Sequence, residues 1–432
     1  MANQRWGVFG ASSNGFSKKP RIQGGEIWIY KKMSAICLLA VFFLLVLCGT
    51  IEGVEQKAMV YVAVEDGSLY TRVAAIDMQT REVQKYIPIG KNAFGGNMVQ
   101  GPNGQYVYLA GNETNNIYII NILTDTVEDS ISIELPRYVD VTPDGQFLYS
   151  ITGEVYTLSI IDLRQKSVLK EIQTGGWMWE ISITPDGRYA YVSGEGILVV
   201  DTSTRQVIKK IDTQGISRSL AWREDKGFLY AVNSSTTIAV IDSSSQSMIR
   251  EILAPVDTEE YRNYRIRSIQ FDPCAKTMFL CGQVISLLLN IETGSLVDTA
   301  IFPSSSNEAQ FTPDGFYIYT GTVPLFAIEG GAPPIPGKIF VLSTANREIR
   351  IIGELDLGLF PFAIETVIYP PPLPGDFNSD LHIDFVDFLL FIQAYGTRYG
   401  LEAWNCVYDL NRDGAVNFPD FLGFAQLYME ER

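Results

Sequence analysis

Histidine is almost absent from this chain of 432 residues, since its one histidine, His382, lies near the C-terminus. The long region before it therefore has no Ser-His-Asp or Cys-His mechanism and no imidazole ligand for a metal. A hydrolase that works through two carboxylates needs no histidine, so carboxylate-based catalysis stays open. Any other chemistry in that region must use different side chains.

Cysteines are also few, at five. Cys37 and Cys48 belong to an apolar N-terminal segment, which leaves Cys274, Cys281 and Cys406, an odd number without zinc-site spacing. These three do not indicate a disulfide framework. Cys274 and Cys281 flank one expected turn, so they either pair with each other or remain buried thiols.

Basic residues are outnumbered, with 33 Lys and Arg against 49 Asp and Glu, and the formal net charge is −16. A protein that binds nucleic acid needs clustered Lys and Arg to neutralise phosphates, so this balance excludes nucleic acid as the expected partner. Apolar residues make up 47% of the chain, which is typical of a globular protein.

The N-terminal region, residues 1–56, is expected to direct export. Lys31 and Lys32 precede an apolar run from Ala35 to Cys48, which is short for a membrane span and has the length of a signal-peptide core. Met33 directly precedes the run and is an alternative start of translation. The prediction is a secreted or cell-surface protein of bacterial type, with membrane contact only if this segment is retained as an anchor.

A turn of the type Pro-Asp-Gly recurs about every forty residues. Each copy follows a short apolar strand and precedes alternating apolar and aromatic residues, with two further strands after them. Four short strands per repeat predict the blades of a β-propeller. The clear copies are Pro102-Asn103-Gly104, Pro143-Asp144-Gly145, Pro185-Asp186-Gly187 and Pro313-Asp314-Gly315.

The repeat predicts an all-β seven-bladed β-propeller over residues 57–369, with a small α-helical calcium-binding C-terminal domain. The first blade lacks its innermost strand, and the segment Phe362 to Ile368 follows the last blade without further strands. Pairing that segment with the first blade closes the ring and removes an exposed sheet edge. The second strands of the seven blades are expected to start near Met59, Tyr106, Phe147, Tyr189, Phe228, Met278 and Phe316.

The run TPDGRYAYVS, followed by ILVVDTSTRQVIKKIDTQG, resembles the YVTN-type propeller repeat of bacterial surface and periplasmic proteins. The resemblance covers about residues 57–369. It implies the propeller fold and leaves function open, because such propellers host binding and catalysis alike.

A proline-rich linker, residues 370–375, ends the propeller, since proline cannot donate to a sheet. Residues 376–432 then contain two loops with oxygen-bearing side chains at positions 1, 3, 5, 9 and 12, the spacing that wraps one loop around one calcium ion. Two calcium ions are expected. The ligands are Asp376, Asn378, Asp380, the His382 carbonyl, Asp384 and Asp387 in the first loop, and Asp409, Asn411, Asp413, the Ala415 carbonyl, Asn417 and Asp420 in the second.

Two loops, each followed by one amphipathic helix (Phe385 to Tyr395 and Phe418 to Met429), resemble the paired EF-hand-like loops of a type I dockerin. That resemblance implies a cohesin-like or cell-surface partner and a link to polysaccharide breakdown. Leu381 stands where calcium loops favour glycine. Phe385-Val386 and Phe418-Pro419 replace the Ser and Thr common at positions 10 and 11 of dockerins, so a calcium-stabilised cap is the alternative.

In a propeller blade, the connections between blades and those between strands two and three lie on one face. The two longest insertions, Ala254 to Arg265 and Pro324 to Gly337, both fall on that face. Residues that begin the innermost strands from this face are expected to line the channel mouth and bind an unknown ligand, because arginines and aromatics make good anchors. They are Asn97, Arg137, Tyr138, Trp179, Glu180, Arg218, Arg267 and Glu308.

The sequence thus predicts a secreted calcium-binding protein. Its propeller would serve as a binding scaffold, and its C-terminal module would anchor or assemble it. The alternative is an enzyme, either carbohydrate-active or lactonase-like, delivered by the same module. A cluster of carboxylates with shifted pKa at the channel mouth would favour the enzyme.

Overall fold

The computed structural model describes residues 57–430, except 94, 153–154, 234–235, 257–264, 275, 283–284, 323–336, 345–347, 358–359, 370, 372, 378–381 and 399–403. The expected signal segment and most of the two long insertions lie outside the described residues. Within the described ranges, no helix is long and apolar enough to cross a membrane.

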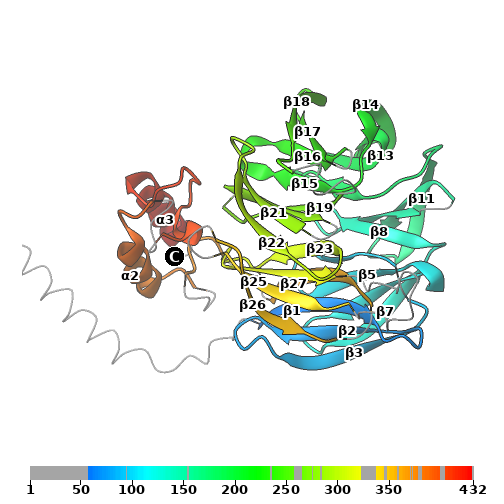
Figure 1. Ribbon diagram of the computed structural model, residues 1–432, viewed down its shortest axis with the longest axis horizontal. Coiled ribbons are helices and arrows are strands. Elements are labelled where there is room, and N and C mark those ends of the chain that lie inside the picture. Colours follow the sequence, from blue (N-terminus) through cyan, green and yellow to red (C-terminus); the bar gives the residue numbers. More distant parts are fainter. Residues whose placement is uncertain are drawn as a thin grey trace, which may run out of the picture. The chain divides into compact units, whose positions relative to one another are not determined.

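Seven antiparallel sheets form the propeller, as predicted (Figure 1). We number the blades from 1, which contains β1, to 7, which contains β23. The strands of blades 1 to 3 are β27 (Phe360–Tyr369), β1 (Lys57–Glu65), β2 (Tyr70–Asp77) and β3 (Val83–Lys91); β4 (Met98–Gln100), β5 (Tyr106–Gly111), β6 (Asn116–Asn121) and β7 (Thr126–Ser132); and β8 (Pro136–Val141), β9 (Phe147–Thr152), β10 (Thr157–Asp162) and β11 (Ser167–Gln173).

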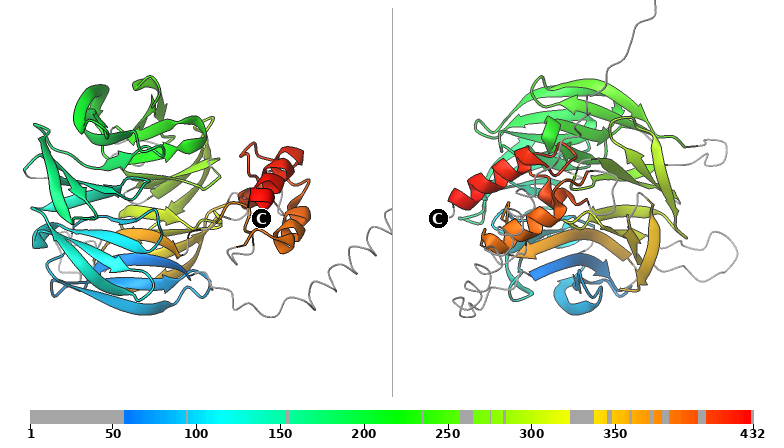
Figure 2. Two further views of the ribbon diagram at one scale, coloured as in Figure 1. Left: turned by 180° about the vertical axis from the view of Figure 1, so that it is seen from behind. Right: turned by 90° about the vertical axis from the view of Figure 1, so that its left-hand side faces the viewer.

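Blades 4 to 7 complete the ring (Figure 2). Their strands are β12 (Ile181–Ile183), β13 (Tyr189–Asp201) and β14 (Gln206–Ile216); β15 (Leu220–Arg223), β16 (Phe228–Val232), β17 (Thr237–Asp242) and β18 (Ser247–Leu253); β19 (Ile266–Phe271), β20 (Thr277–Gly282), β21 (Ile285–Asn290) and β22 (Leu296–Ile301); and β23 (Ser306–Phe311), β24 (Tyr317–Thr322), β25 (Ile339–Ser343) and β26 (Arg350–Leu355).

Strand β27 closes the ring by pairing with β1, as the sequence predicts. Met59 lies opposite Val367, and the register runs from Lys57 against Tyr369 to Glu65 against Phe360. The innermost strands β4, β8, β12, β15, β19, β23 and β27 each contact the next around the channel. Without β27, strand β1 would have an unpaired edge, so the closure covers an edge that could otherwise pair with another chain.

Blade 4 differs from the four-strand prediction because it has three strands. One long strand, β13, replaces the expected second and third strands: its first half pairs with β12 and its second half with β14. The connection between the two halves is the short run Gly194-Glu195-Gly196, in which Gly196 has a φ of +77°. A turn this tight leaves no unpaired loop between the halves.

The core lies between blades, where neighbouring sheets pack face to face. One aromatic side chain occupies the same position in the second strand of every blade, and all seven are buried. Burying a side chain of this size contributes about 2–3 kcal/mol to stability, so the repeat places one strong packing anchor in each blade. The seven are Tyr61, Tyr108, Tyr149, Tyr191, Tyr230, Phe279 and Tyr319.

The Pro-Asp-Gly turns pack against one another from blade to blade. A Cβ added to Gly145 would lie 3.4 Å from Pro102, and one added to Gly187 would lie 3.3 Å from Pro143. Gly104, whose φ is +71°, meets Pro371 of the linker instead, at 2.8 Å. Blade 1 has no such turn because β27 is its innermost strand, so the linker proline takes the place of the missing turn proline.

The C-terminal module contains the helices α2 (Phe385–Ala394) and α3 (Phe418–Glu430) and a short 3-10 turn, η4 (Cys406–Tyr408). Their bounds match the predicted amphipathic stretches to within a residue. Phe391 and Phe424 stack at 5.7 Å between ring centroids and form its small core with the buried Val416. The backbone N–H of Val416 donates to the Thr397 carbonyl at 2.9 Å, which joins the second loop to the end of α2.

Of the two alternatives for Cys274 and Cys281, a bond between them is wrong, and the buried free thiol is correct for Cys281 alone. Cys274, in the turn after β19, forms a disulfide with Cys406, with 5.5 Å between their Cα atoms. Cys281 is a buried free thiol on β20, packed in the core between blades 6 and 7. Cys281 lies near the far end of β20 from that turn, opposite Ser268, so the two cysteines suggested as partners cannot meet.

Candidate functional site

The second predicted calcium loop brings three carboxylates together ahead of α3. Oxygens of Asp409, Asp413 and Asp420 lie within 4.8 Å of one another. Asp409 and Asp420 are buried while Asp413 is exposed, so the cluster opens to solvent on one side. Calcium favours several hard oxygen ligands around one point, and this donor set fits it.

Backbone N–H groups hold these carboxylates in place. Asp420 accepts from the N–H of Asn411 at 3.0 Å and of Asn417 at 2.8 Å. Asp409 accepts from Asp413 at 3.0 Å and from Gly414 at 2.7 Å. Burial is the main cause that raises the pKa of Asp409, and the charges of Asp420 and Asp413 add to it.

The amides predicted as ligands gather at the same point. Asn411 and Asn417 each donate through Nδ2 to Asp413 Oδ2, at 3.2 and 3.3 Å. Asn417 also donates to the Ala415 carbonyl at 3.2 Å. All six residues predicted as ligands of the second loop are therefore neighbours in space.

The first loop is closed in the same way, over the part of it that the structure describes. Asp387 is fully buried and accepts from the N–H of Phe377 at 2.6 Å and of Asp384 at 2.8 Å. Asp376 is also buried, whereas His382 is exposed. Asp384, predicted as a water-mediated ligand, caps α2 through the N–H of Val386 at 2.7 Å. Asn378 and Asp380 lie outside the described residues.

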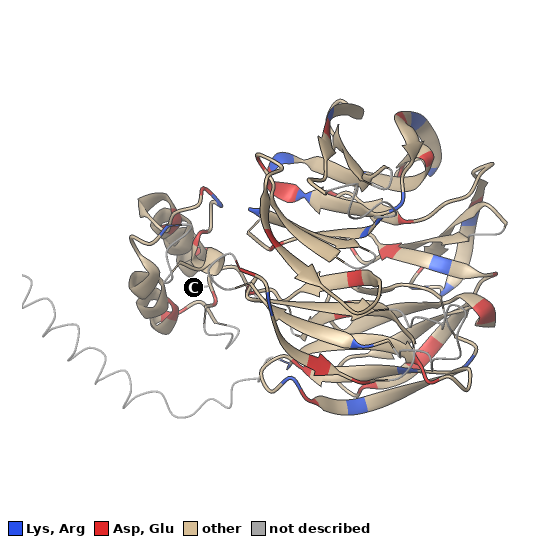
Figure 3. Cartoon of the chain, in the orientation of Figure 1, with Lys and Arg blue, Asp and Glu red and all other residues tan. Residues whose placement is uncertain are grey.

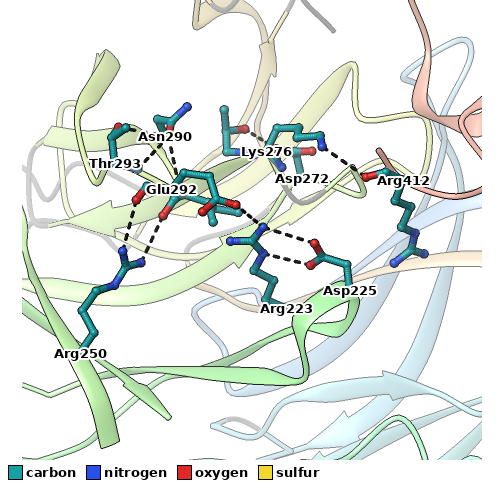
Figure 4. Close-up of polar contacts among 11 residues, drawn as sticks. Arg223, Asp225, Arg250, Asp272, Lys276, Asn290, Glu292, Thr293 and Arg412 are labelled. Carbon is teal, nitrogen blue, oxygen red and sulfur yellow. Dashed lines mark hydrogen bonds and ion pairs between the residues drawn. The ribbon is translucent and has the colours of Figure 1, made fainter. Parts of the chain in front are cut away.

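The second loop also contacts the propeller next to the disulfide (Figure 4). Lys276 donates to the Arg412 carbonyl at 3.4 Å, and the Arg412 guanidinium lies 3.6 Å from Glu224. Beside this contact, the buried Arg223 pairs with Asp225 at 3.0 Å and with Glu292 of blade 6. These ion pairs brace the turns of blades 5 and 6 that meet the loop.

In the channel, side chains of one innermost strand reach the backbone of the next. Asn97 accepts from the Val139 N–H at 2.8 Å and donates to the Val139 carbonyl at 3.0 Å. Asp140 accepts from the Ile183 N–H at 2.7 Å, and Glu365 accepts from the Gln100 N–H at 3.1 Å. We call these contacts inter-blade clasps.

Glu180 and Glu308 make clasps of the same kind. Glu180 accepts from the N–H of Leu220 and from the Ser219 hydroxyl, and Glu308 accepts from the Ile364 N–H. Ser219, next to β15, likewise accepts from the Ile269 N–H at 3.3 Å, so among the described residues at least six innermost strands supply a polar side chain to the neighbouring blade. Each clasp satisfies a backbone group that would otherwise face the channel unpaired.

The four channel carboxylates, Asp140, Glu180, Glu308 and Glu365, are half-buried. Burial raises the pKa of Asp140 to about 6 and the pKa values of Glu180 and Glu365 to about 8. Burial also raises the pKa of Glu308 well above its usual range, and the charges of Glu180 and Glu365 add to that shift. These shifts favour the protonated form of Glu180, Glu308 and Glu365 at neutral pH, whereas the lower pKa of Asp140 favours its ionised form.

Closer to the mouth, arginines stack on tryptophan. The Arg137 and Arg218 guanidinium carbons lie 5.2 and 4.6 Å from the Trp179 ring centroid. Trp177 lies 5.9 Å from Trp179 and 5.6 Å from Arg137. Burial, followed by the charges of Arg218 and Arg265, lowers the pKa of Arg267.

The predicted channel residues thus separate into two groups. Arg137, Trp179 and Arg218 form one contact cluster, while Asn97 is a clasp between blades. Burial raises the pKa of Tyr138, and the charges of Glu180 and Glu308, from blades 4 and 7, add to the shift.

Sequence reasoning missed Asp140, Glu365 and Trp177. Strand alternation could have found Asp140, because it lies two residues after Tyr138 and faces the same side of β8. Glu365 lies on the closing strand, whose channel face depends on the register with β1. Trp177 precedes β12 by several residues, and its position depends on how that connection folds.

No family model and no curated protein matches this chain. Solved structures do: the hydrazine synthase of Kuenenia stuttgartiensis is 19% identical, with a TM-score of 0.52, over 63% of this chain and 89% of that one. The dihydro-heme d1 dehydrogenase NirN, solved in complex with DHE, is 17% identical, with a TM-score of 0.53, over 71% of this chain and 75% of that one. Likeness at this identity establishes the propeller fold alone. The YVTN repeat type and the dockerin resemblance stay predictions.

Proposed function

We propose that this protein is exported and binds two calcium ions in its C-terminal module, which anchors or assembles a propeller that serves as a ligand-binding scaffold. The observation that carries the calcium proposal is the convergence of Asp409, Asp413 and Asp420 within 4.8 Å. The same backbone closure on Asp387 supports a matching first site. Calcium supplies the positive charge that a cluster of this kind needs to fold tightly.

Export gains support from the disulfide between Cys274 and Cys406. Disulfides persist outside the reducing cytosol, so a bond joining the module to the propeller suits a secreted or cell-surface protein. The signal segment predicted over residues 35–48 would direct the protein to the same compartment.

An assembly role is supported by apolar side chains exposed on the helices of the module. On α2, Val386, Leu389 and Ile392 recur every third residue, and Val386 and Ile392 are each 47% exposed. On α3, Phe418 and Leu422 are exposed as well. Such a stripe on a short helix suits a protein partner, in keeping with the cohesin-like or cell-surface partner expected from the dockerin resemblance.

Calcium titration calorimetry on the full chain tests this function. We expect two binding events in the wild type and the loss of one in Asp420→Asn, because Asp420 would provide the closing carboxylate of the second loop. Asp387→Asn should remove the other event. Circular dichroism should show helix content rising with calcium.

The matched control is Asp212→Asn, which removes an exposed aspartate from β14 of the propeller. It should leave both binding events in place. Absence of heat at millimolar calcium in the wild type would refute the calcium proposal, and so would two unchanged events in Asp420→Asn.

A second candidate is a glycoside hydrolase that works through the channel carboxylates. Two carboxyl groups, one protonated and one ionised, suffice for that reaction. The pKa of Glu180, about 8, suits the protonated acid, and the pKa of Asp140, about 6, suits the ionised group. Both groups are already engaged as inter-blade clasps, however, so their structural role accounts for their presence. Turnover of a glycoside by the wild type, lost in Glu180→Gln with the fold intact, would establish the enzyme.

A further inference from the structure

Four arginines at or beside the starts of the innermost strands form no ion pair within the described part of the chain. Among the described residues, no carboxylate lies within ion-pair distance of Arg137, Arg218, Arg265 or Arg267, whereas Arg223, bound to Asp225 and Glu292, shows how this chain pairs a buried arginine. Lys and Arg occur on other strands and turns as well (Figure 3). In a chain of net charge −16, an unpaired cationic cluster at the mouth attracts an anion.

Stacking fixes how two of these arginines present their donors. Trp179 contacts both Arg137 of blade 3 and Arg218 of blade 5, so the three side chains bridge three successive blades. A guanidinium held against a ring keeps its N–H groups free at its edge. Those edges match the two oxygens of a carboxylate.

Flat aromatic surfaces lie beside the cations. Trp177 is 37% exposed and Tyr156 is 40% exposed, and their rings meet edge to face at 6.2 Å. With Trp179 they form a row that leads from blade 3 toward the channel. Exposed aromatic faces next to unpaired donors favour a ligand with apolar ring faces and anionic substituents.

We propose that the channel mouth binds an acidic oligosaccharide. Its uronate carboxyl groups would lie on Arg137, Arg218 and Arg267, and its pyranose rings would pack on Trp177 and Trp179. This inference rests on the proposed scaffold role of the propeller and names the ligand class. An extended acidic peptide fits less well, because clasps from Asn97 and other side chains already occupy backbone groups of the innermost strands that such a peptide would need to pair with.

Titration calorimetry of the full-length protein with trigalacturonate tests the proposal, with heats of the sugar in calcium buffer alone subtracted. Arg137→Gln and Arg218→Gln should each raise the dissociation constant at least tenfold, and binding should weaken as salt is added. Trp177→Ala should weaken binding about fivefold. The same trisaccharide with its carboxyl groups reduced to alcohols should bind at least tenfold more weakly than the acid to the wild type.

Arg164→Gln is the matched control, since Arg164 is exposed on the turn between β10 and β11, away from the mouth. It should leave the affinity unchanged. The proposal is overturned if trigalacturonate does not bind, if the reduced trisaccharide binds equally well, if hexa-aspartate binds as tightly, or if the mouth arginines have no effect. Calcium titration of the same variants separates the two proposals, because loss of sugar binding with both calcium events intact contradicts only the ligand assignment.

Discussion

Replacing Glu365 by glutamine should remove part of the pH dependence of stability. Burial raises the pKa of Glu365 from 4.5 to about 8. The folded protein therefore keeps this proton between pH 4.5 and 8 while the unfolded chain releases it, and the free energy of unfolding falls as the pH rises through that window. In Glu365→Gln the amide is neutral at every pH and its oxygen can still accept from the Gln100 N–H.

The expected size follows from the shift. One pKa unit corresponds to about 1.4 kcal/mol, so a shift from 4.5 to about 8 would cost about 5 kcal/mol if fully expressed. Because the side chain is only half-buried, we discount this value for solvent screening and expect about 2 kcal/mol. The wild type should lose about that much stability relative to the variant between pH 5 and pH 8.

Urea denaturation at pH 5, 6, 7 and 8, with calcium held constant, measures the effect. Taking the difference between wild type and variant cancels every other titration, including those of the calcium loops. Glu171→Gln, which removes an exposed carboxylate from β11, is the charge-matched control and should follow the wild-type curve. Parallel curves for wild type and Glu365→Gln would refute the reasoning, because Glu365 would then titrate alike in both states.

Two further predictions concern the joints of the fold. Cys406→Ser should lower the stability of the C-terminal module by about 2–4 kcal/mol, because the bond to Cys274 closes a segment of 132 residues. Thermal melts of wild type and variant measure the effect. The two proteins should differ without reductant and melt alike when reductant breaks the disulfide. In urea denaturation, Gly104→Ala should lower the free energy of unfolding by about 2 kcal/mol more than Gly145→Ala does. Both residues have positive φ, but the new Cβ at 104 would lie 2.8 Å from Pro371. Equal losses would show that Pro371 shifts without cost and would contradict the prediction.

The sequence determined the propeller because its information is local and repeated. Each Pro-Asp-Gly turn requires a glycine with positive φ, and each following strand alternates apolar and aromatic residues, so seven blades could be counted without any tertiary contact. The closing strand was predictable for a similar reason, since an unpaired strand at each end of a ring has only one partner. The spacing of oxygen-bearing residues in 409–420 likewise lies within one short loop.

Only the tertiary structure decided which distant residues meet. Glu365 reaches Gln100 across 265 residues, and Cys274 finds Cys406 rather than its near neighbour Cys281. The arginines that stack on Trp179 come from different blades, so no local pattern marks them as a cluster. Local spacing fixes turns, strands and loops, whereas the pKa of a channel carboxylate depends on burial by neighbouring blades, and burial exists only once the ring has closed.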